Sequence, residues 1–318
     1  EDYLMGINFS RLLTLKYGNS ISNYLNTKYS VVSVGRVMTC VLGMVVRRER
    51  EIREFVKTPF YRVIESVNVD GHTFTGEWRA VKGSAYFESP KLYKENGFKE
   101  KEEAKKLIAV LKEGTSPLTC RIVSIEKKKE KKNPPLLFNL AELQNECSKR
   151  FKISPDETLR IVQELYEKKL VTYPRTDARV LSTAVSKEIT KNLNGLSKYQ
   201  MAAPYMQDIL HYGAYKNRAK TRYVNDKQIT DHYAIIPTGQ GLNVLISLSQ
   251  TSQRVYETIV RRFLCIFCPP AVYQKVSLVT EMQKEKFFSG FKVLQEEVYL
   301  KYATNSFARK SAADRSQE

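Results

Sequence analysis

The chain has 318 residues, with 52 Lys and Arg against 34 Asp and Glu, which gives a formal net charge of +18. This length and a hydrophobic content of 42% allow one large or two ordinary globular domains. The basic excess favours a polyanionic partner, nucleic acid first, with a generally basic protein as the alternative. The longest apolar runs, 39–46 and 263–272, are shorter than the roughly 18 residues that span a bilayer, so we expect no membrane association.

The N-terminus shows neither the basic nor the apolar region of a secretory signal, so we expect a cytoplasmic protein. Cysteine usage agrees, because five is an odd number and only Cys265 and Cys268 form a C-x-x-C pair. The pair lies in an apolar run with no second pair or histidine nearby. This pattern favours buried structural thiols over a zinc or redox site.

The first fifty residues predict two helices, separated by the polar stretch 18–29. Apolar residues of the second helix recur at helical spacing, which places on one face Val34, Val37, Val41, Val45 and Ile52. Four arginines cluster near its C-terminal end, namely Arg47, Arg48, Arg50 and Arg53. Cations suit that end of a helix dipole, and the cluster is either a solvated surface or a phosphate-binding one.

Residues 60–87 change to short alternating runs with a turn signal at Asp70-Gly71, which predicts β-sheet. A charged helix is expected over 100–113, followed by a strand over 119–125. The lysine-rich run 127–132 then leads into Asn133-Pro134-Pro135, where regular structure should end. We expect a domain boundary there.

Helix signals dominate the next segment. Asn139-x-x-Glu142 and Ser154-Pro155-Asp156-Glu157 are typical capping boxes, so two helices should flank Phe151. The second of these helices should bury Leu159, Val162, Leu165 and Tyr166. A β-prone run at 170–173 and a helix over 183–193 then indicate a helix-turn-helix or winged-helix arrangement with Tyr173 near its edge.

The C-terminal part predicts one more helix and then a sheet. A helix after Thr251 should end before Pro269-Pro270 and place on one side Val255, Ile259, Phe263 and Phe267. A sheet segment is expected over 272–302. Residues 303–318 have the polar composition of a frayed or disordered tail.

The segment Val-Thr-Tyr-Pro-Arg-Thr-Asp at 171–177 carries the strongest chemical signal. Tyrosine is a poor nucleophile near neutral pH, since its free pKa is about 10. We expect Arg175 and Arg179 to surround the phenol of Tyr173 with positive charge, with Asp177 orienting one of them. Such cations would stabilise the phenolate and the charge on an attacked phosphate. Taken alone, Tyr-Pro-Arg is also compatible with a strand end that turns back.

Four short blocks carry a family resemblance, at 4–11, 33–39, 173–177 and 231–238. In order and spacing they resemble type IA DNA topoisomerases, closest to the bacterial topoisomerase III branch, over nearly the whole chain. The resemblance implies that Tyr173 cuts one DNA strand and holds its 5′ phosphate, that Arg175 stabilises the reacting phosphate, and that His232 positions it. It also implies a set of DNA-binding residues: Arg11, Ser33, Val34, Gly35, Arg36, Val37, Met38, Thr176, Asp177 and Arg179.

Two departures from the family's pattern matter. Met38 and Cys40 stand where the family usually has glutamine and proline, so a polar contact to DNA is lost and binding should weaken. The family also begins with an acidic (Toprim) domain that holds Mg²⁺ on a D-x-D pair, whereas no two aspartates here are separated by one residue. We therefore expect Mg²⁺ in the complete enzyme, held by that absent domain, no metal in this chain, and no activity of the chain alone.

The resemblance implies an α+β multidomain fold, a toroid with a helical base, β-rich arms and a winged-helix-like domain that carries the tyrosine. The helical base would comprise 1–50 and 249–268, and the β-rich arm 51–132 and 269–302. The winged-helix-like domain would comprise 133–248, with a polar tail at 303–318. We expect a cytoplasmic, nucleoid-associated monomer that acts on single-stranded and negatively supercoiled DNA.

Two other hypotheses remain open. The first is a non-catalytic clamp for single-stranded DNA, derived from such an enzyme. The second is a basic winged-helix transcription factor, which would need a dimer interface and a recognition helix rich in Arg, Asn or Gln. The helix expected at 183–193 offers one Asn and two Lys, so we rank this hypothesis last.

Overall fold

The computed structural model describes residues 2–113, 117–211, 213, 215–216 and 220–307. The chain divides into two compact units, and each is discontinuous in sequence. Unit 1 comprises Glu1–Arg62 and Pro90–Lys106, and unit 2 comprises Val63–Ser89 and Leu107–Glu318. We describe each unit by itself.

Unit 1 is built on two helices, α1 (Asp2–Leu25) and α2 (Arg36–Arg53). The connection between them runs back along α1, because Val32 and Val34 donate backbone hydrogen bonds to the hydroxyls of Thr14 (2.9 Å) and Ser10 (2.8 Å). A short hairpin of β3 (Leu92–Lys94) and β4 (Gly97–Phe98) and the first part of α3 (Lys101–Lys112) complete the unit.

Two expectations for this region were wrong. The first helix does not break at Gly18 but continues to Leu25. Glycine at this position leaves room for the carbonyl of Ser30, which would lie 3.0 Å from an added Cβ. Asn26, with a φ of 54°, follows the helix end. The second helix begins at Arg36, so Val34 lies in the extended connection before it.

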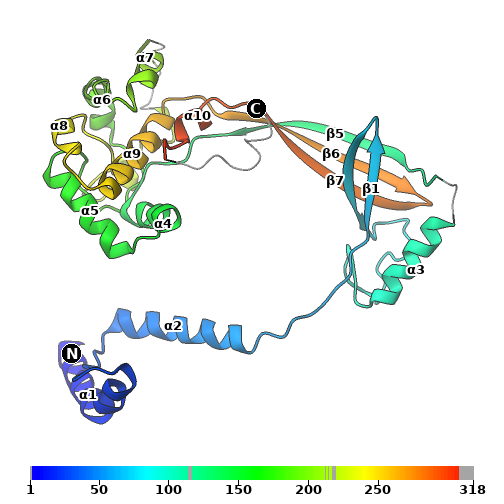
Figure 1. The fold of residues 1–318 in the computed structure, drawn as a ribbon, viewed down its shortest axis with the longest axis horizontal. Helices are drawn as coiled ribbons and strands as arrows, with labels where there is room; N and C mark the ends of the chain where they lie inside the picture. The colour runs from blue at the N-terminus through cyan, green and yellow to red at the C-terminus, as the bar shows by residue number, and fades with distance from the viewer. Residues whose placement is uncertain (1, 114–116, 212, 214, 217–219, 308–318) are drawn as a thin grey trace. The chain divides into compact units, whose positions relative to one another are not determined.

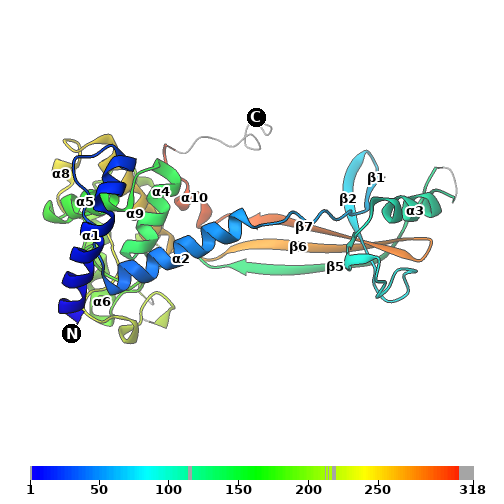
Figure 2. The same ribbon diagram turned by 90° about the horizontal axis from the view of Figure 1, so that it is seen from below.

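Unit 2 contains an antiparallel sheet with the strand order β1-β2-β7-β6-β5. Its strands are β1 (Ile64–Val69), β2 (His72–Arg79), β5 (Arg121–Lys132), β6 (Ala271–Met282) and β7 (Glu285–Glu296). The turn predicted at Asp70-Gly71 is confirmed, with both residues at positive φ between β1 and β2. The helices between residues 140 and 303 gather at one end of β5, β6 and β7, and β1 and β2 lie at the other (Figures 1 and 2).

Strand β5 is longer than expected. We predicted that it would end at Ile125, but it continues through the lysine run and pairs with β6 as far as Lys132↔Ala271. The lysines are tolerated because β5 is an edge strand and most of its side chains are exposed, and charged side chains are typical of such edges. Asn133-Pro134-Pro135 then ends the strand, as predicted.

The helical part of unit 2 comprises α4 (Leu140–Phe151), α5 (Pro155–Glu167), α6 (Thr183–Leu196), α7 (Ala203–His211), α8 (Leu242–Leu245), α9 (Gln250–Cys265) and α10 (Leu300–Ala303). Both predicted caps are confirmed. The side chains of Asn139 and Ser154 accept hydrogen bonds from the backbone N–H groups of Glu142 and Glu157. None of the described helices is long and apolar enough to cross a bilayer.

One hydrophobic core joins these helices. It contains Leu143 of α4, Leu165 of α5 and Leu193 of α6, together with Phe263 of α9, all essentially inaccessible to solvent. Helix α9 therefore packs in the same core as α4 to α6, although we assigned residues 249–268 to a helical base. The expectation of buried thiols is confirmed, and burial raises the pKa of Cys265 to about 12.

Three further expectations were wrong. Residues 170–173 form no strand but an isolated bridge, Val171↔Pro237, because their partner is a loop rather than a strand. Tyr166 is exposed rather than buried, and its ring lies edge-on to that of Tyr173. Residues 303–307 are not frayed: Asn305 is buried, and Phe307 contacts Phe151 at 5.3 Å between ring centroids. The rest of the predicted tail, 308–318, lies outside the described residues.

Candidate active site

The tyrosine segment is fixed to the 234–236 segment by Thr172. The backbone N–H of Thr172 donates to the carbonyl of Ile236 (3.0 Å), and its hydroxyl donates to the carbonyl of Ala234 (3.0 Å). The same hydroxyl accepts from the N–H of Ile236 (3.0 Å). Three hydrogen bonds thus converge on the residue before Tyr173.

A second threonine fixes the other side of the tyrosine. Thr176 is buried, and its hydroxyl donates to the carbonyl of His232 at 2.7 Å. That hydroxyl also accepts from the N–H of Ala178 at 3.1 Å. Thr176 therefore sets the position of the His232 backbone relative to the tyrosine segment.

These hydrogen bonds place two predicted site residues in contact. The ring centroids of Tyr173 and His232 are 4.3 Å apart, with an interplanar angle of 41°. The Tyr166 ring meets Tyr173 edge-on at 5.5 Å. Tyr173 is partly buried, whereas His232 is exposed, so the phenol and the imidazole lie at the surface of the helical core.

The two arginines that we expected around Tyr173 differ in their surroundings. Arg175 is exposed next to the buried Pro174. Arg179 is engaged by Glu142, at 3.4 Å between Nη1 and Oε1, and donates from Nε to the carbonyl of Leu137 at 3.3 Å. Asp177 forms no ion pair among the residues that the structure describes, so the expectation that it orients an arginine was wrong. Arg175 is thus the exposed cation of this segment.

Two sequence blocks meet in unit 1. The open cavity there, about 1200 Å³ in volume, is lined by residues in or directly beside the two blocks, Tyr3, Met5, Gly6, Ile7, Phe9, Ser10, Ser33, Val34, Gly35, Thr39 and Cys40. Val37, Met38 and Arg11 are exposed, and the side chain of Arg36 lies outside the described part of the structure. Gly35 is the N-cap of α2 in an extended conformation, so it directs the chain from the connection into the helix.

The described residues do not fit a magnesium site. Among them, no group of three or more His, Cys, Asp and Glu side chains is placed to hold a metal ion. The carboxylate of Glu142 is paired with Arg179.

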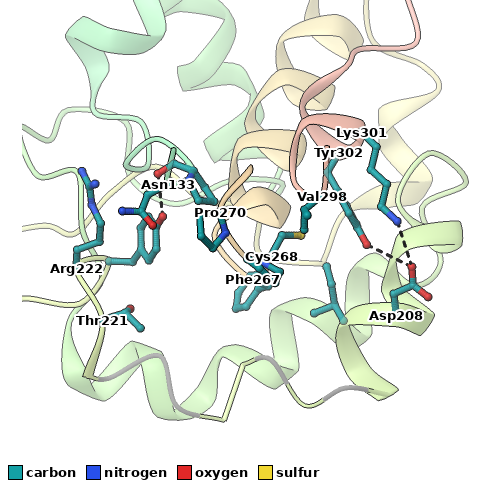
Figure 3. Close-up of a pocket in the computed structure, with 14 residues that line it drawn as sticks. Asn133, Asp208, Thr221, Arg222, Phe267, Cys268, Pro270, Val298, Lys301 and Tyr302 are labelled. Atoms are coloured by element: carbon teal, nitrogen blue, oxygen red, sulfur yellow. Dashed lines mark hydrogen bonds and ion pairs between the residues drawn. The ribbon is translucent and has the colours of Figure 1, made fainter. Parts of the chain in front are cut away.

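A separate cavity of about 710 Å³ lies where β5 and β6 join the helical part (Figure 3). It has an apolar middle that includes Phe267 and Pro270, and Asp208 with Lys301 and Tyr302 at one end. None of the predicted site residues lines it. The cavity is therefore distinct from the tyrosine site.

Comparisons with known proteins show the family of the chain. A family model described as DNA topoisomerase matches residues 1–317, and the chain belongs to this family, the type IA DNA topoisomerases. It is 32% identical to DNA topoisomerase 3 of Bacillus subtilis over 93% of this chain and 36% of that protein. It is 34% identical to DNA topoisomerase 3 of Salmonella typhimurium over 93% of this chain and 42% of that protein.

The fold similarity extends to a solved structure. Full-length topoisomerase I from Thermotoga maritima matches 95% of this chain and 46% of its own length, with a TM-score of 0.57 and 24% identity. DNA topoisomerase 1 of Pyrococcus horikoshii is 32% identical over 95% of this chain and 40% of its own length. The chain thus spans about two fifths of the length of the curated relatives it matches.

Sequence reasoning missed the residues that position the tyrosine. Thr172, Asn139 and Tyr166 hold or contact the site, yet we named none of them as site residues. Thr172 lies inside the quoted motif, and Asn139 was identified only as a helix cap. Neither has a local pattern that would reveal a partner distant in the chain.

Proposed function

We propose that this chain is the strand-cutting portion of a type IA DNA topoisomerase. The phenolic oxygen of Tyr173 attacks a phosphodiester of single-stranded DNA, so that an Oη–P bond forms and the bond from phosphorus to the 3′ oxygen breaks. The phenol loses its proton and the released 3′ oxygen takes one up. The cut strand stays attached through its 5′ phosphate, and the reverse reaction religates it.

The contact between Tyr173 and His232 supports this proposal most directly. The two residues come from two different blocks of the resemblance, 173–177 and 231–238, and their ring centroids lie 4.3 Å apart. An imidazole at this position is within reach of a phosphate that approaches the phenol, and it can donate a hydrogen bond to it. Exposed Arg175 would stabilise the charge that builds on that phosphate.

We also propose the larger setting that the family implies. The chain would form the helical base, β-rich arms and winged-helix-like domain of a toroid, with α9 sharing the core of the winged-helix-like domain. It would act as a monomer on single-stranded and negatively supercoiled DNA. The complete enzyme would use Mg²⁺ held by residues other than those described here. The chain alone would bind single-stranded DNA without relaxing plasmid, because the acid that protonates the 3′ oxygen would come from the family's acidic domain.

A covalent-adduct assay tests the proposal. Single-stranded DNA labelled at its 3′ end is incubated with the chain and with the family's acidic domain, added as a separate polypeptide in the presence of Mg²⁺. We expect labelled protein on a denaturing gel, and none with Tyr173→Phe, although that variant should still shift DNA on a native gel. Label retained by Tyr173→Phe would overturn the assignment of the nucleophile, and DNA binding without any adduct would favour the non-catalytic clamp.

A further inference from the structure

A short segment that leads from β5 into the first residue of α4, residues 136–140, lies against the tyrosine segment, and we call it the strap. The N–H of Leu137 donates to the carbonyl of Arg179, and the N–H of Leu140 donates to the carbonyl of Thr176, both at 3.2 Å. The side-chain amide of Asn139 donates to the carbonyl of Asp177 at 3.0 Å. The strap is therefore hydrogen-bonded along the chain that follows Tyr173.

The strap also contacts the segment that carries His232. The N–H of Ile235 donates to the carbonyl of Phe138 at 2.8 Å, and the two residues form an isolated antiparallel bridge. The strap thus bonds both segments whose contact forms the site. A displacement of the strap would change the position of Tyr173 relative to His232.

One arginine of α9 holds the strap from the other side. Nη1 of Arg262 donates to the carbonyl of Leu136 at 3.1 Å. Its guanidinium carbon lies 4.0 Å from the centroid of the Phe138 ring, close enough for a cation–π contact. Arg262 thus contacts the backbone of the strap at Leu136 and a side chain of the strap at Phe138.

The charge of Arg262 is not explained by ion pairing. The nearby carboxylates of Glu142 and Glu146 pair with Arg179 and Arg150 instead, and Arg262 has no salt bridge among the described residues. Burial lowers the pKa of the Arg262 guanidinium, which indicates that the charged form is desolvated there. A desolvated cation without a carboxylate partner costs stability. We therefore infer that Arg262 acts through the position it gives to the strap.

We propose that Arg262 is a positioning residue of the cleavage reaction, which holds Tyr173 against His232 through the strap. The proposal rests on the function proposed above, since it assigns a purpose to that geometry. Arg262 touches neither Tyr173 nor His232 in any recorded contact, so it acts through Leu136 and Phe138. The strap directly follows Asn133-Pro134-Pro135, and the carbonyl of Pro134 is itself held by the hydroxyl of Tyr223 at 2.8 Å.

The test uses the imidazole of His232 as a reporter that does not depend on cleavage. The chain has three histidines, so selective isotope labelling gives three resolvable ring signals. Tyr173→Leu removes the ring next to His232 and thereby assigns its signal. We expect Arg262→Met to move that signal toward its position in Tyr173→Leu, with Arg262→Lys intermediate because lysine keeps the charge but loses the planar fork.

A matched control comes from the same helix. Arg254 also lies over an aromatic ring, with its guanidinium carbon 5.5 Å from the centroid of Phe307, but contacts no residue of the strap in any recorded bond. Arg254→Met should leave the His232 signal in place. A urea titration of each variant tests whether it is folded. If Arg262→Met does not fold, Phe138→Leu takes its place, because it removes the ring that Arg262 contacts.

The same variants are then measured in the adduct assay. Arg262→Met should slow cleavage at saturating DNA by about 10- to 100-fold while leaving DNA affinity unchanged, because misplacing a reacting group affects the chemical step. A folded Arg262→Met with an unmoved His232 signal, or with an equal loss of DNA affinity and cleavage, would overturn the proposal. If Tyr173→Phe still formed adducts, the proposed function would fail while the His232 signals would still report on the strap.

Discussion

Two threonine hydroxyls, rather than charged groups, hold the candidate site together. Thr172 and Thr176 each use one hydroxyl both to donate and to accept, and each connects the tyrosine segment to the segment around His232. Such bonds contribute roughly 1 kcal/mol each, and a buried partner left without one costs more. Their main effect is therefore geometric, since they fix which residues face each other.

Arg175 is the residue whose charge we expect to act on the reaction. In the adduct assay, Arg175→Ala should slow cleavage by about 100-fold or more while weakening DNA binding much less, because the charge develops on the phosphate during attack. Arg175→Lys should restore only part of the rate, since lysine cannot form a bidentate contact. Equal losses of affinity and rate would instead make Arg175 a residue that only positions DNA.

Glu65 is a carboxyl group placed where a neutral side chain would be more stable. Burial raises its pKa above the ordinary 4.5, although a hydrogen bond from Thr280 opposes this, and its other oxygen has no partner among the described residues. A raised pKa means that the stability this group contributes is present below about 4.5 and is lost as pH rises. Glu65→Gln should therefore increase the free energy of unfolding, and more so at pH 7.5 than at pH 4.5.

Urea titrations at the two pH values check this expectation for Glu65. The exposed Glu88→Gln serves as the control and should change the midpoint little at either pH. A Glu65→Gln variant that is less stable than the parent chain at pH 7.5 would show that the ionised carboxylate is favoured in the folded state.

Helix caps and tight turns could be predicted from the sequence, because they depend on residues that are close together in the chain. The caps at Asn139 and Ser154 and the turn at Asp70-Gly71 rely on residues no more than three positions away, and all three are confirmed. The strand expected at 170–173 was wrong because its extended residues pair with a loop, which no local pattern reveals. The extension of β5 likewise depends on β6, a strand distant in the sequence.

The candidate site shows the same limit of local reasoning. The family resemblance named Tyr173 and His232, and the structure brings their rings together. The resemblance did not name Thr172 or Arg262, because their contacts depend on how α9 and the strap pack around the motif. We placed the charge of Arg179 beside the phenol because the two residues are close in sequence. In the structure Arg179 instead forms an ion pair with Glu142.

The three long strands carry a row of like charges. Lys128 of β5, Lys275 of β6 and Lys292 of β7 are direct cross-strand partners, and like charges in such positions are destabilising. Lys275→Thr should raise the free energy of unfolding by up to about 1 kcal/mol at low salt. The gain should shrink in 1 M salt, where the Debye length is about 3 Å.

Chemical denaturation at both salt concentrations measures the effect. Lys129→Thr is the control, because Lys129 lies opposite Gln274 rather than another lysine. It should change stability less than Lys275→Thr does. Destabilisation by Lys275→Thr would mean that the attraction between Lys275 and nearby carboxylates such as Glu130 outweighs the repulsion within the row.

For the molecule as a whole, a net charge of +18 should govern how it binds DNA. Each phosphate neutralised on a single strand releases roughly 0.7 counterions, so affinity should fall steeply as salt rises. Fluorescence anisotropy with a labelled oligonucleotide over a series of salt concentrations gives the slope. An affinity that does not change with salt would exclude an electrostatic DNA-binding surface.

The five thiols of the chain should differ widely in reactivity. Cys40 is exposed, whereas burial raises the pKa of Cys147 and of Cys265 to about 12, so both remain neutral thiols near pH 8. A disulfide reagent at pH 8 should modify Cys40 quickly and the two buried thiols only after unfolding. Cys40→Ser should remove the fast phase, and rapid modification of Cys147 or Cys265 in the folded chain would contradict their burial.

Because Cys40 is more reactive than the buried thiols, a probe attached to it can report on DNA binding. Cys40 lies on α2, among the residues that line the cavity where the two N-terminal sequence blocks meet. Cys120 is partly buried and burial raises its pKa, so Cys40 should react before it. A nitroxide attached at Cys40 would then need no engineered cysteine, and its rotational freedom would drop when an oligonucleotide entered the cavity. Because a nitroxide on α2 lies in a different compact unit from Tyr173, the arrival of DNA could be timed separately from the cut.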